Sequence, residues 1–253
     1  GTEFFLMSFV EGDVIWEPNI PQATTEERMK IYSSMNDTIS KLHKVNPYDI
    51  GLDDFGKPGN YVARQVSRWS KQYVASETTE IKSMNNLMDW LPKNLPTEKQ
   101  TRLVHGDFSL SNVIINTENF KISAILDWEL STLGDPIADF SYHCIQYKLN
   151  PVLSNESECK ALGIPTEKDY VKMYEEKAEV EIGEEWNLYM GASDKSDWSF
   201  LEISTLLVGW YHRIKMKHAR AGITMYFVRV ANAKSRVESS DKSLCPEVWP
   251  FDG

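Results

Sequence analysis

The amino-acid sequence predicts a mainly helical α+β fold in which a short β-hairpin carries the functional residues. Two patterns lead to this prediction. Apolar residues recur at helical spacing over much of the chain, as in Ile31, Met35 and Ile39. Short apolar or β-branched runs occur instead at 102–105, 113–115 and 122–126, and the turn-forming segment 116–119 joins the last two.

Local end signals place the helices along the chain. Thr24 and the acidic residues after it open the first helix, which is expected to run to His43. Asp135 and Pro136 open another, because Pro is favoured in the first turn of a helix. The remaining helices are expected at 60–76, 84–91, 166–180, 195–220 and 223–239, with loops at 150–164 and 181–193.

Three polar side chains lie at the ends of the predicted strands. Asp107 follows the first strand, Asn112 lies five residues later, and Asp127 closes another strand twenty residues after Asp107. Phosphoryl transfer needs an Asp that orients the acceptor hydroxyl and takes its proton, with an Asn and an Asp that hold magnesium. The spacing therefore predicts Asp107 as the catalytic base and Asn112 and Asp127 as ligands of Mg²⁺.

The hairpin gives this prediction a geometric basis. Antiparallel pairing places Asn112, before one strand, and Asp127, after the other, at the same edge, where one cation can bridge them. Each residue taken alone also fits a structural role, as a turn residue or a partner of the local backbone. The joint spacing favours the functional interpretation. The cysteines lack the spacing of a zinc site; they are Cys144, Cys159 and Cys245.

The motif resembles that of one family of small-molecule kinases. His105-Gly-Asp107, Asn112 and the later Leu126-Asp-Trp-Glu129 are similar to the aminoglycoside phosphotransferase and choline kinase family, which has a protein-kinase-like fold. The continuation to Asp139 is similar to the phosphotransferase domains found alone in bacteria or joined to acyl-CoA dehydrogenases in animals. The resemblance is specific over 104–143. It implies ATP (or GTP) as phosphoryl donor, Mg²⁺, and a small hydroxyl-bearing acceptor.

The same resemblance suggests roles for the neighbouring residues. His105 is expected to support the catalytic loop by hydrogen bonding, and Asp139 to tie the following helix back to that loop. Asp135 is expected to be structural. Two roles stay open for Glu129, which is either a residue near the acceptor or a plain surface carboxylate.

The first residues of the chain predict a strand. Residues 2–12 are rich in aromatic and β-branched residues and end in Gly12. Taken alone this is an ordinary core strand. The resemblance implies that it leads into the hinge that reads the adenine edge. The nucleotide-binding residues would then be Met7, Ser8, Phe9 and Val10 in the hinge, with Ile114 and Leu126 as the apolar floor.

The resemblance also implies a division of the chain. Residues 1–12 would be the last small-lobe strand and the hinge. Residues 13–253 would be the helical large lobe, with the catalytic loop at 104–127 and acceptor-side helices from about residue 150. Trp186, Tyr189 and Trp198 are expected in the core or near the acceptor. A chain that begins at the hinge would lack the small lobe, so we expect the 253 residues alone to be inactive and their exposed hinge surface to favour association.

Composition narrows the class of partner. Lys and Arg total 27 against 37 Asp and Glu, which gives a net charge of −10. This charge argues against binding to nucleic acid or to anionic membranes. No apolar run reaches the length of a membrane span, and the cysteines suggest no disulfide framework. We expect an intracellular, cytoplasmic protein, with organellar targeting left open.

Two function hypotheses remain at this stage. The first is an ATP- and magnesium-dependent phosphotransferase that acts on a hydroxyl of a small molecule, either an aminoglycoside-like polycation or a hydroxyacyl metabolite. The second is a non-catalytic binding or scaffolding module that lacks a complete nucleotide site. The intact set of Asp107, Asn112 and Asp127 favours the enzyme.

Overall fold

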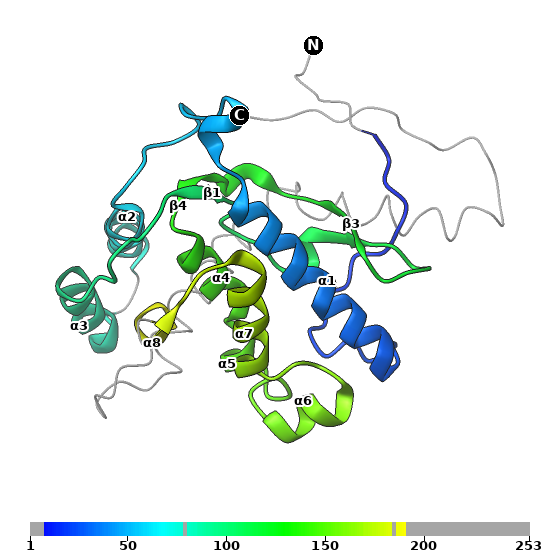
Figure 1. Ribbon diagram of the computed structural model, residues 1–253. Coiled ribbons are helices and arrows are strands. Elements are labelled where there is room, and N and C mark those ends of the chain that lie inside the picture. Colours follow the sequence, from blue (N-terminus) through cyan, green and yellow to red (C-terminus); the bar gives the residue numbers. More distant parts are fainter. Residues whose placement is uncertain (1–7, 78–79, 184–185, 191–253) are drawn as a thin grey trace, which may run out of the picture.

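The computed structural model describes residues 8–77, 80–183 and 186–190, and these residues form a helical body with two small sheets (Figure 1). Met7, Trp198 and the helices expected at 195–220 and 223–239 lie outside the described residues. The described helices are α1 Thr25–Lys44, α2 Tyr61–Ser76, α3 Lys82–Trp90, α4 Pro136–Cys144, α5 Gln146–Leu149, α6 Glu156–Leu162, α7 Glu167–Ala178 and α8 Trp186–Tyr189.

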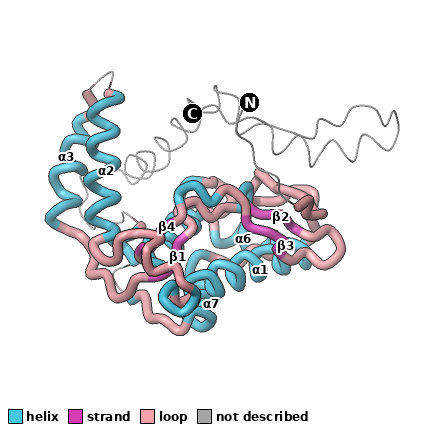
Figure 2. Tube along the Cα trace, turned by 90° about the horizontal axis from the view of Figure 1, so that it is seen from above, coloured by secondary structure: helices cyan, strands magenta, loops and turns pink. Residues whose placement is uncertain are grey.

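Each sheet is an antiparallel pair of short strands (Figure 2). The predicted hairpin is confirmed: β2 (Val113–Ile115) pairs with β3 (Ile122–Ile125). Its turn is closed by the side chain of Asn116, which accepts hydrogen bonds from two backbone N–H groups that follow it. The strand expected before the catalytic loop is β1 (Arg102–Val104), and it pairs with an unpredicted strand, β4 (Thr132–Gly134).

The long helix α1 organises the core. Thr24 and Glu27 form the capping box that the sequence predicts. The apolar face of the helix, which includes Ile31, Met35 and Ile39, is buried and packs against α7 and the strands (Figure 1). Helix α7 also contacts α4, where Phe140 stacks on Tyr174 of α7 with ring centroids 3.8 Å apart. The result is a continuous core beneath the predicted site.

Helices α2 and α3 lie side by side, apart from α1 and α7 (Figures 1 and 2). Both helices were predicted, but their apolar faces do not join the main core. On α2 the buried residues are Tyr61 and Tyr73. Val66 and Trp69, which have helical spacing, line a cavity that Tyr61 and Tyr73 also line. The amphipathic pattern therefore identified the helix but not what its apolar face contacts.

The N-terminal strand prediction is wrong for the part of it that is described. Residues 8–12 form no strand, and pairing begins only at Asp13, which exchanges two backbone hydrogen bonds of 2.8 Å with Ile115. Gly12 has φ +143° and bends the backbone just before this bridge. A pattern of aromatic and β-branched residues indicates a pairing tendency, but a partner edge must also be present.

The loop prediction for 150–164 is also wrong, because the segment contains α6. The side chain of Asn155 caps this helix by accepting from the N–H groups of Ser157 and Glu158, and Gly163 ends it in the left-handed conformation. These signals are present in the sequence, but the helix is only two turns long. The predicted loop at 181–193 likewise contains the short helix α8.

Candidate active site

One buried carboxylate on α4 fixes the start of the catalytic loop. Asp139 accepts hydrogen bonds from the backbone N–H groups of His105 and Gly106, both at 2.8 Å. The tie between helix and loop predicted from the sequence is thus present. Burial alone would raise the pKa of Asp139, but the hydrogen bond and charge of His43 and the bond from the His105 N–H hold that pKa below its ordinary value. Asp139 is therefore an ionised acceptor beneath the loop.

The glycine between these residues is required by the local geometry. Gly106 has φ +83°, and a Cβ atom there would stand 2.8 Å from the carbonyl oxygen of Leu130. Any side chain would be strained by the backbone conformation and would also push against the segment before β4. The loop can approach the next segment closely only because this residue is Gly.

Asp107 and Asn112 meet as the sequence predicts. The Nδ2 group of Asn112 donates to the Oδ2 atom of Asp107 at 2.7 Å and to its backbone carbonyl at 2.8 Å. Both residues are buried. The side chain of Asn112 thereby closes the turn and fixes the carboxylate. Since its nitrogen faces Asp107, its oxygen is the atom available to a cation.

Two further residues of α4 hold the loop, and the sequence analysis missed both. Tyr142 donates its hydroxyl to the Oδ1 atom of Asp107 at 2.9 Å, and His143 Nδ1 donates to the carbonyl oxygen of Phe108 at 3.2 Å. Burial and the nearby Asp107 raise the pKa of Tyr142 well above its ordinary value, so the phenol stays protonated. The available signal was helical spacing, because residues three and four after Asp139 share its face.

His105 acts on the backbone rather than on a reacting atom. Its Nε2 group donates to the carbonyl oxygen of Leu126 at 2.8 Å, and its Nδ1 atom accepts from the N–H of Asp107 at 3.2 Å. The ring is fully buried. Both nitrogens are engaged with backbone groups, which agrees with the supporting role expected for this residue.

Asp127 lies at the hairpin edge occupied by Asn112. The N–H of the preceding residue, Leu126, donates to the Asn112 carbonyl oxygen at 2.8 Å. Asp127 then adopts a left-handed conformation with φ 62° and turns the chain into the short 3-10 helix Trp128–Leu130. Glu129 is exposed. One amide oxygen and one carboxylate suit Mg²⁺, which binds few protein ligands. Among the described residues, no three His, Cys, Asp or Glu side chains form a competing metal cluster.

The segment that the sequence predicts as a hinge lies next to the hairpin. Phe9 is 56% exposed, Ser8 is exposed and Val10 is partly buried. Gly12 packs directly on the strand, because a Cβ atom there would lie 2.6 Å from the Cγ2 atom of Ile114. Residues 8–10, which are predicted to bind the adenine, therefore lie close in the chain to a residue that contacts Ile114, one of the two predicted floor residues. Leu126, the other floor residue, is partly buried at the end of β3.

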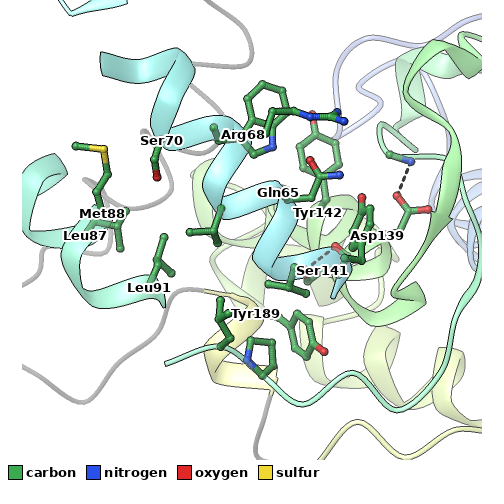
Figure 3. Close-up of a pocket in the computed structure, with 18 of the residues that line it drawn as sticks. Gln65, Arg68, Ser70, Leu87, Met88, Leu91, Asp139, Ser141, Tyr142 and Tyr189 are labelled. Carbon is green, nitrogen blue, oxygen red and sulfur yellow. Dashed lines mark hydrogen bonds between the residues drawn. The ribbon is translucent and has the colours of Figure 1, made fainter. Parts of the chain in front are cut away.

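A cavity of about 240 Å³ opens beside the catalytic loop, between α2, α3 and α4 (Figure 3). Tyr142 lines the cavity and donates its hydroxyl to Asp107, so this side chain lies between the cavity and the carboxylate of Asp107. Tyr189 lines it too and donates to Asp135 at 2.6 Å. Trp186 instead packs on Phe140 of the core, with ring centroids 5.6 Å apart. Of the aromatic residues expected near the acceptor, the structure brings Tyr189 to the cavity.

Comparisons with known proteins define the class of this chain. A family profile described as "Phosphotransferase enzyme family" matches residues 1–175. The chain therefore belongs to this family, as its motif predicted. Its fold is the protein-kinase-like α+β fold of those enzymes. None of the described helices is long and apolar enough to cross a membrane.

Individual relatives refine this membership. The chain is 41% identical to mouse acyl-CoA dehydrogenase family member 10 over 218 residues, which cover 84% of the chain and 20% of the relative. It is 35% identical to human acyl-CoA dehydrogenase family member 11 over 178 residues, covering 69% of the chain and 23% of the relative. The chain thus spans about a fifth of the length of these proteins. The predicted similarity to dehydrogenase-linked phosphotransferase domains is confirmed.

Solved structures agree with this placement. A crystal structure of a candidate aminoglycoside phosphotransferase from Ralstonia eutropha matches with a TM-score of 0.73 and 38% identity, covering 92% of this chain and 69% of that one. Macrolide 2'-phosphotransferase type I matches with a TM-score of 0.53 and 14% identity over 90% of this chain and 67% of that one. The second likeness concerns the fold alone.

Proposed function

We propose that this chain carries the catalytic and acceptor-binding residues of a kinase that transfers a phosphoryl group from ATP to a hydroxyl of a small apolar metabolite. The observation that carries the proposal is the setting of Asp107. Its carboxylate accepts from Asn112, which leads into the hairpin, and from Tyr142, which lines the cavity. A hydroxyl group bound in the cavity would come within reach of this carboxylate.

Asp107 acts on the acceptor. The carboxylate orients the acceptor hydroxyl and takes its proton as the acceptor oxygen bonds to the γ-phosphorus and the bond to the β–γ bridging oxygen breaks. His105 and Asp139 keep the loop that bears Asp107 in place through backbone hydrogen bonds. Because these contacts are buried, the carboxylate is held ready before substrate arrives.

Asn112 and Asp127 hold the metal, and the hinge holds the base. Mg²⁺ bound there neutralises charge on the phosphate oxygens of the nucleotide. Asn112 offers its amide oxygen and Asp127 its carboxylate, and hard oxygen ligands of this kind suit magnesium. Ile114 and Leu126 supply the apolar surface for the adenine, with the segment 8–10 beside it.

The cavity lining favours an apolar acceptor over a polycation. Among the described lining residues, the charged ones are Arg68 and Asp139. Asp139 is 2% exposed and already binds the catalytic loop, so it offers no free carboxylate to a cationic sugar. Val66 is an apolar lining residue, and Leu87 and Met88 on α3 contribute further apolar side chains (Figure 3). A hydroxyacyl metabolite fits this lining, with its chain along α2 and α3.

The test is phosphorylation by the natural full-length protein with Mg·ATP. Three acceptors would be compared by mass spectrometry: a hydroxyacyl thioester, the free hydroxy acid and an aminoglycoside. We expect ATP-dependent phosphorylation of the hydroxyacyl compounds and none of the aminoglycoside. If the protein bound nucleotide but phosphorylated no hydroxyl acceptor, the non-catalytic binding module would be the better description. Replacing ATP by GTP in the same assay decides the donor.

A further inference from the structure

Tyr142 links the acceptor cavity to the catalytic carboxylate. It lies on α4, and its hydroxyl donates to the Oδ1 atom of Asp107 at 2.9 Å. The other carboxylate oxygen, Oδ2, accepts from Asn112 Nδ2 at 2.7 Å. A carboxylate that is bonded at both oxygens cannot rotate freely about its terminal torsion, which is otherwise a broad and soft one. The two donors together fix the plane of the group.

The two donors come from different parts of the fold. Asn112 belongs to the loop itself, five residues after Asp107, whereas Tyr142 is thirty-five residues away on a core helix. The position of α4 is in turn fixed by the packing of Phe140 on Tyr174 and by the hydrogen bonds that Asp139 accepts from the loop backbone. The core helix α4, and not only the loop that bears Asp107, therefore fixes the orientation of the carboxylate plane.

We propose that Tyr142 is a positioning residue for phosphoryl transfer, whose hydroxyl holds the Asp107 carboxylate in the orientation that meets an acceptor hydroxyl in the cavity. This inference rests on the proposed function. The phenolic proton stays on Tyr142 throughout. The proton that moves is that of the acceptor hydroxyl, which passes to Asp107 while the acceptor oxygen forms its bond to the γ-phosphorus and ADP departs.

Tyr142→Phe tests this role, because it removes one oxygen and keeps the ring that lines the cavity. We expect kcat to fall about 10- to 100-fold, the range for a misoriented catalytic group. The KM values for the acceptor and for Mg·ATP should stay within about twofold, since the apolar contacts and the metal ligands remain. A tyrosine that only supported the fold would change the unfolding midpoint and leave kcat per folded molecule unaltered.

Tyr147→Phe is the matched control. Tyr147 is buried, whereas Tyr142 is partly buried, and Tyr147 also donates its hydroxyl, but to the carbonyl oxygen of Pro165. Tyr147→Phe should lower the free energy of unfolding by about as much as Tyr142→Phe does and leave kcat unchanged. If both variants lowered kcat equally, the effect would be structural and the proposal would be overturned.

A double substitution decides whether Tyr142 acts through Asp107. If it does, adding Tyr142→Phe to Asp107→Asn should lower the residual rate no further, because residues that act as one unit are not additive. A full additional 10-fold loss would contradict the proposal. If the wild type phosphorylated the acceptor and Tyr142→Phe had the same kcat, this inference alone would be overturned. Absence of phosphoryl transfer in the wild type would overturn the proposed function, and this inference with it.

Discussion

At the residue scale, the site depends on hydrogen bonds that orient two acidic groups with different tasks. Asp107 is buried and bonded to Asn112 and Tyr142, whereas Asp127 is only partly buried at the hairpin edge. The first is bonded to Tyr142, which lines the cavity, and the second has a left-handed backbone conformation at the end of the hairpin. Replacing Asp107 or Asp127 by Asn keeps the shape of the side chain and removes its negative charge.

We predict that Asp107→Asn and Asp127→Asn abolish turnover in the natural protein and leave it folded. Each loss should reach about three powers of ten in rate, as for other preorganised charged groups. Calorimetry should show that Mg·ATP binds more weakly to Asp127→Asn than to Asp107→Asn, because Asp127 is a proposed metal ligand and Asp107 is not. Glu118→Gln in the exposed hairpin turn is the control. Near-normal turnover by Asp107→Asn would refute its assignment as the base.

His143 provides a prediction about pH. Burial lowers its pKa to about 4, although the bond to the Phe108 carbonyl and the charge of Asp139 oppose the shift. The unfolded chain has the ordinary value of 6.5 and binds a proton that the folded chain excludes. The stabilisation from this neutral ring is therefore complete above about pH 6.5 and is lost progressively as the pH falls towards 4.

The measurement compares the free energy of unfolding of the wild type and His143→Asn by urea denaturation at several pH values. We expect the wild type to lose stability more steeply than the variant between pH 6.5 and 4. An amide at position 143 can still donate to the Phe108 carbonyl but does not titrate. Parallel pH dependence of the two proteins would show that His143 is not the group responsible.

At the element scale, α4 is the helix that holds the catalytic loop. Its residues Asp139, Tyr142 and His143 bond to four successive residues of the loop, 105–108. The helix begins at a side-chain cap, since Asp135 accepts from the N–H of Ile137 at 2.8 Å. Residues 105–108 form no helix or strand, so α4 supplies the rigidity that this part of the loop lacks.

Asp139→Asn should weaken this attachment. The amide keeps one acceptor oxygen but cannot accept from both N–H groups and from His43 as the carboxylate does. We expect a loss of about 1.5–3 kcal/mol in the free energy of unfolding, the range for a hydrogen bond to a charged group, together with a fall in kcat.

Thr24→Ala is the comparison for this experiment. It removes the capping box of α1, far from the loop, and should cost about 1 kcal/mol while kcat stays normal. If both variants changed stability and neither changed kcat, α4 would be a packing element without a part in catalysis.

At the scale of the whole molecule, the helix pair α2 and α3 lines one side of the cavity and α4 lines the other (Figure 3). The wall supplied by these helices is mostly hydrocarbon, and the wall supplied by α4 carries Tyr142 beside the catalytic carboxylate. An acceptor would thus bind by its apolar part at one side and react at the other. The length of that part should be set by the volume of the cavity, about 240 Å³.

Val66→Trp should restrict the protein to acceptors with shorter chains. The larger side chain would fill space between α2 and α3, so KM for a long-chain hydroxyacyl acceptor should rise about 10-fold or more, since each buried methylene contributes about 0.8 kcal/mol. KM for a short-chain acceptor should change little. Lys71→Trp on an exposed part of the same helix is the control. Equal effects on both chain lengths would mean that the acceptor binds elsewhere.

The sequence by itself determined the parts of this protein that depend on local chemistry. The spacing of Asp107, Asn112 and Asp127 predicted phosphoryl transfer, and the motif around these residues carried the resemblance to the family that the profile match shows. The cap at Thr24 likewise located the beginning of α1.

Tertiary structure decided the contacts between residues far apart in the chain. The bond from Tyr142 to Asp107 spans thirty-five residues, and the pattern on α2 reads the same whether its apolar face meets a core or a cavity. Ser8–Gly12 has the composition of a strand, yet pairing starts only where Asp13 meets Ile115. Periodicity reports that a face is apolar or that a segment can pair. What that face or segment contacts depends on the packing of the remaining chain, and local sequence does not encode it.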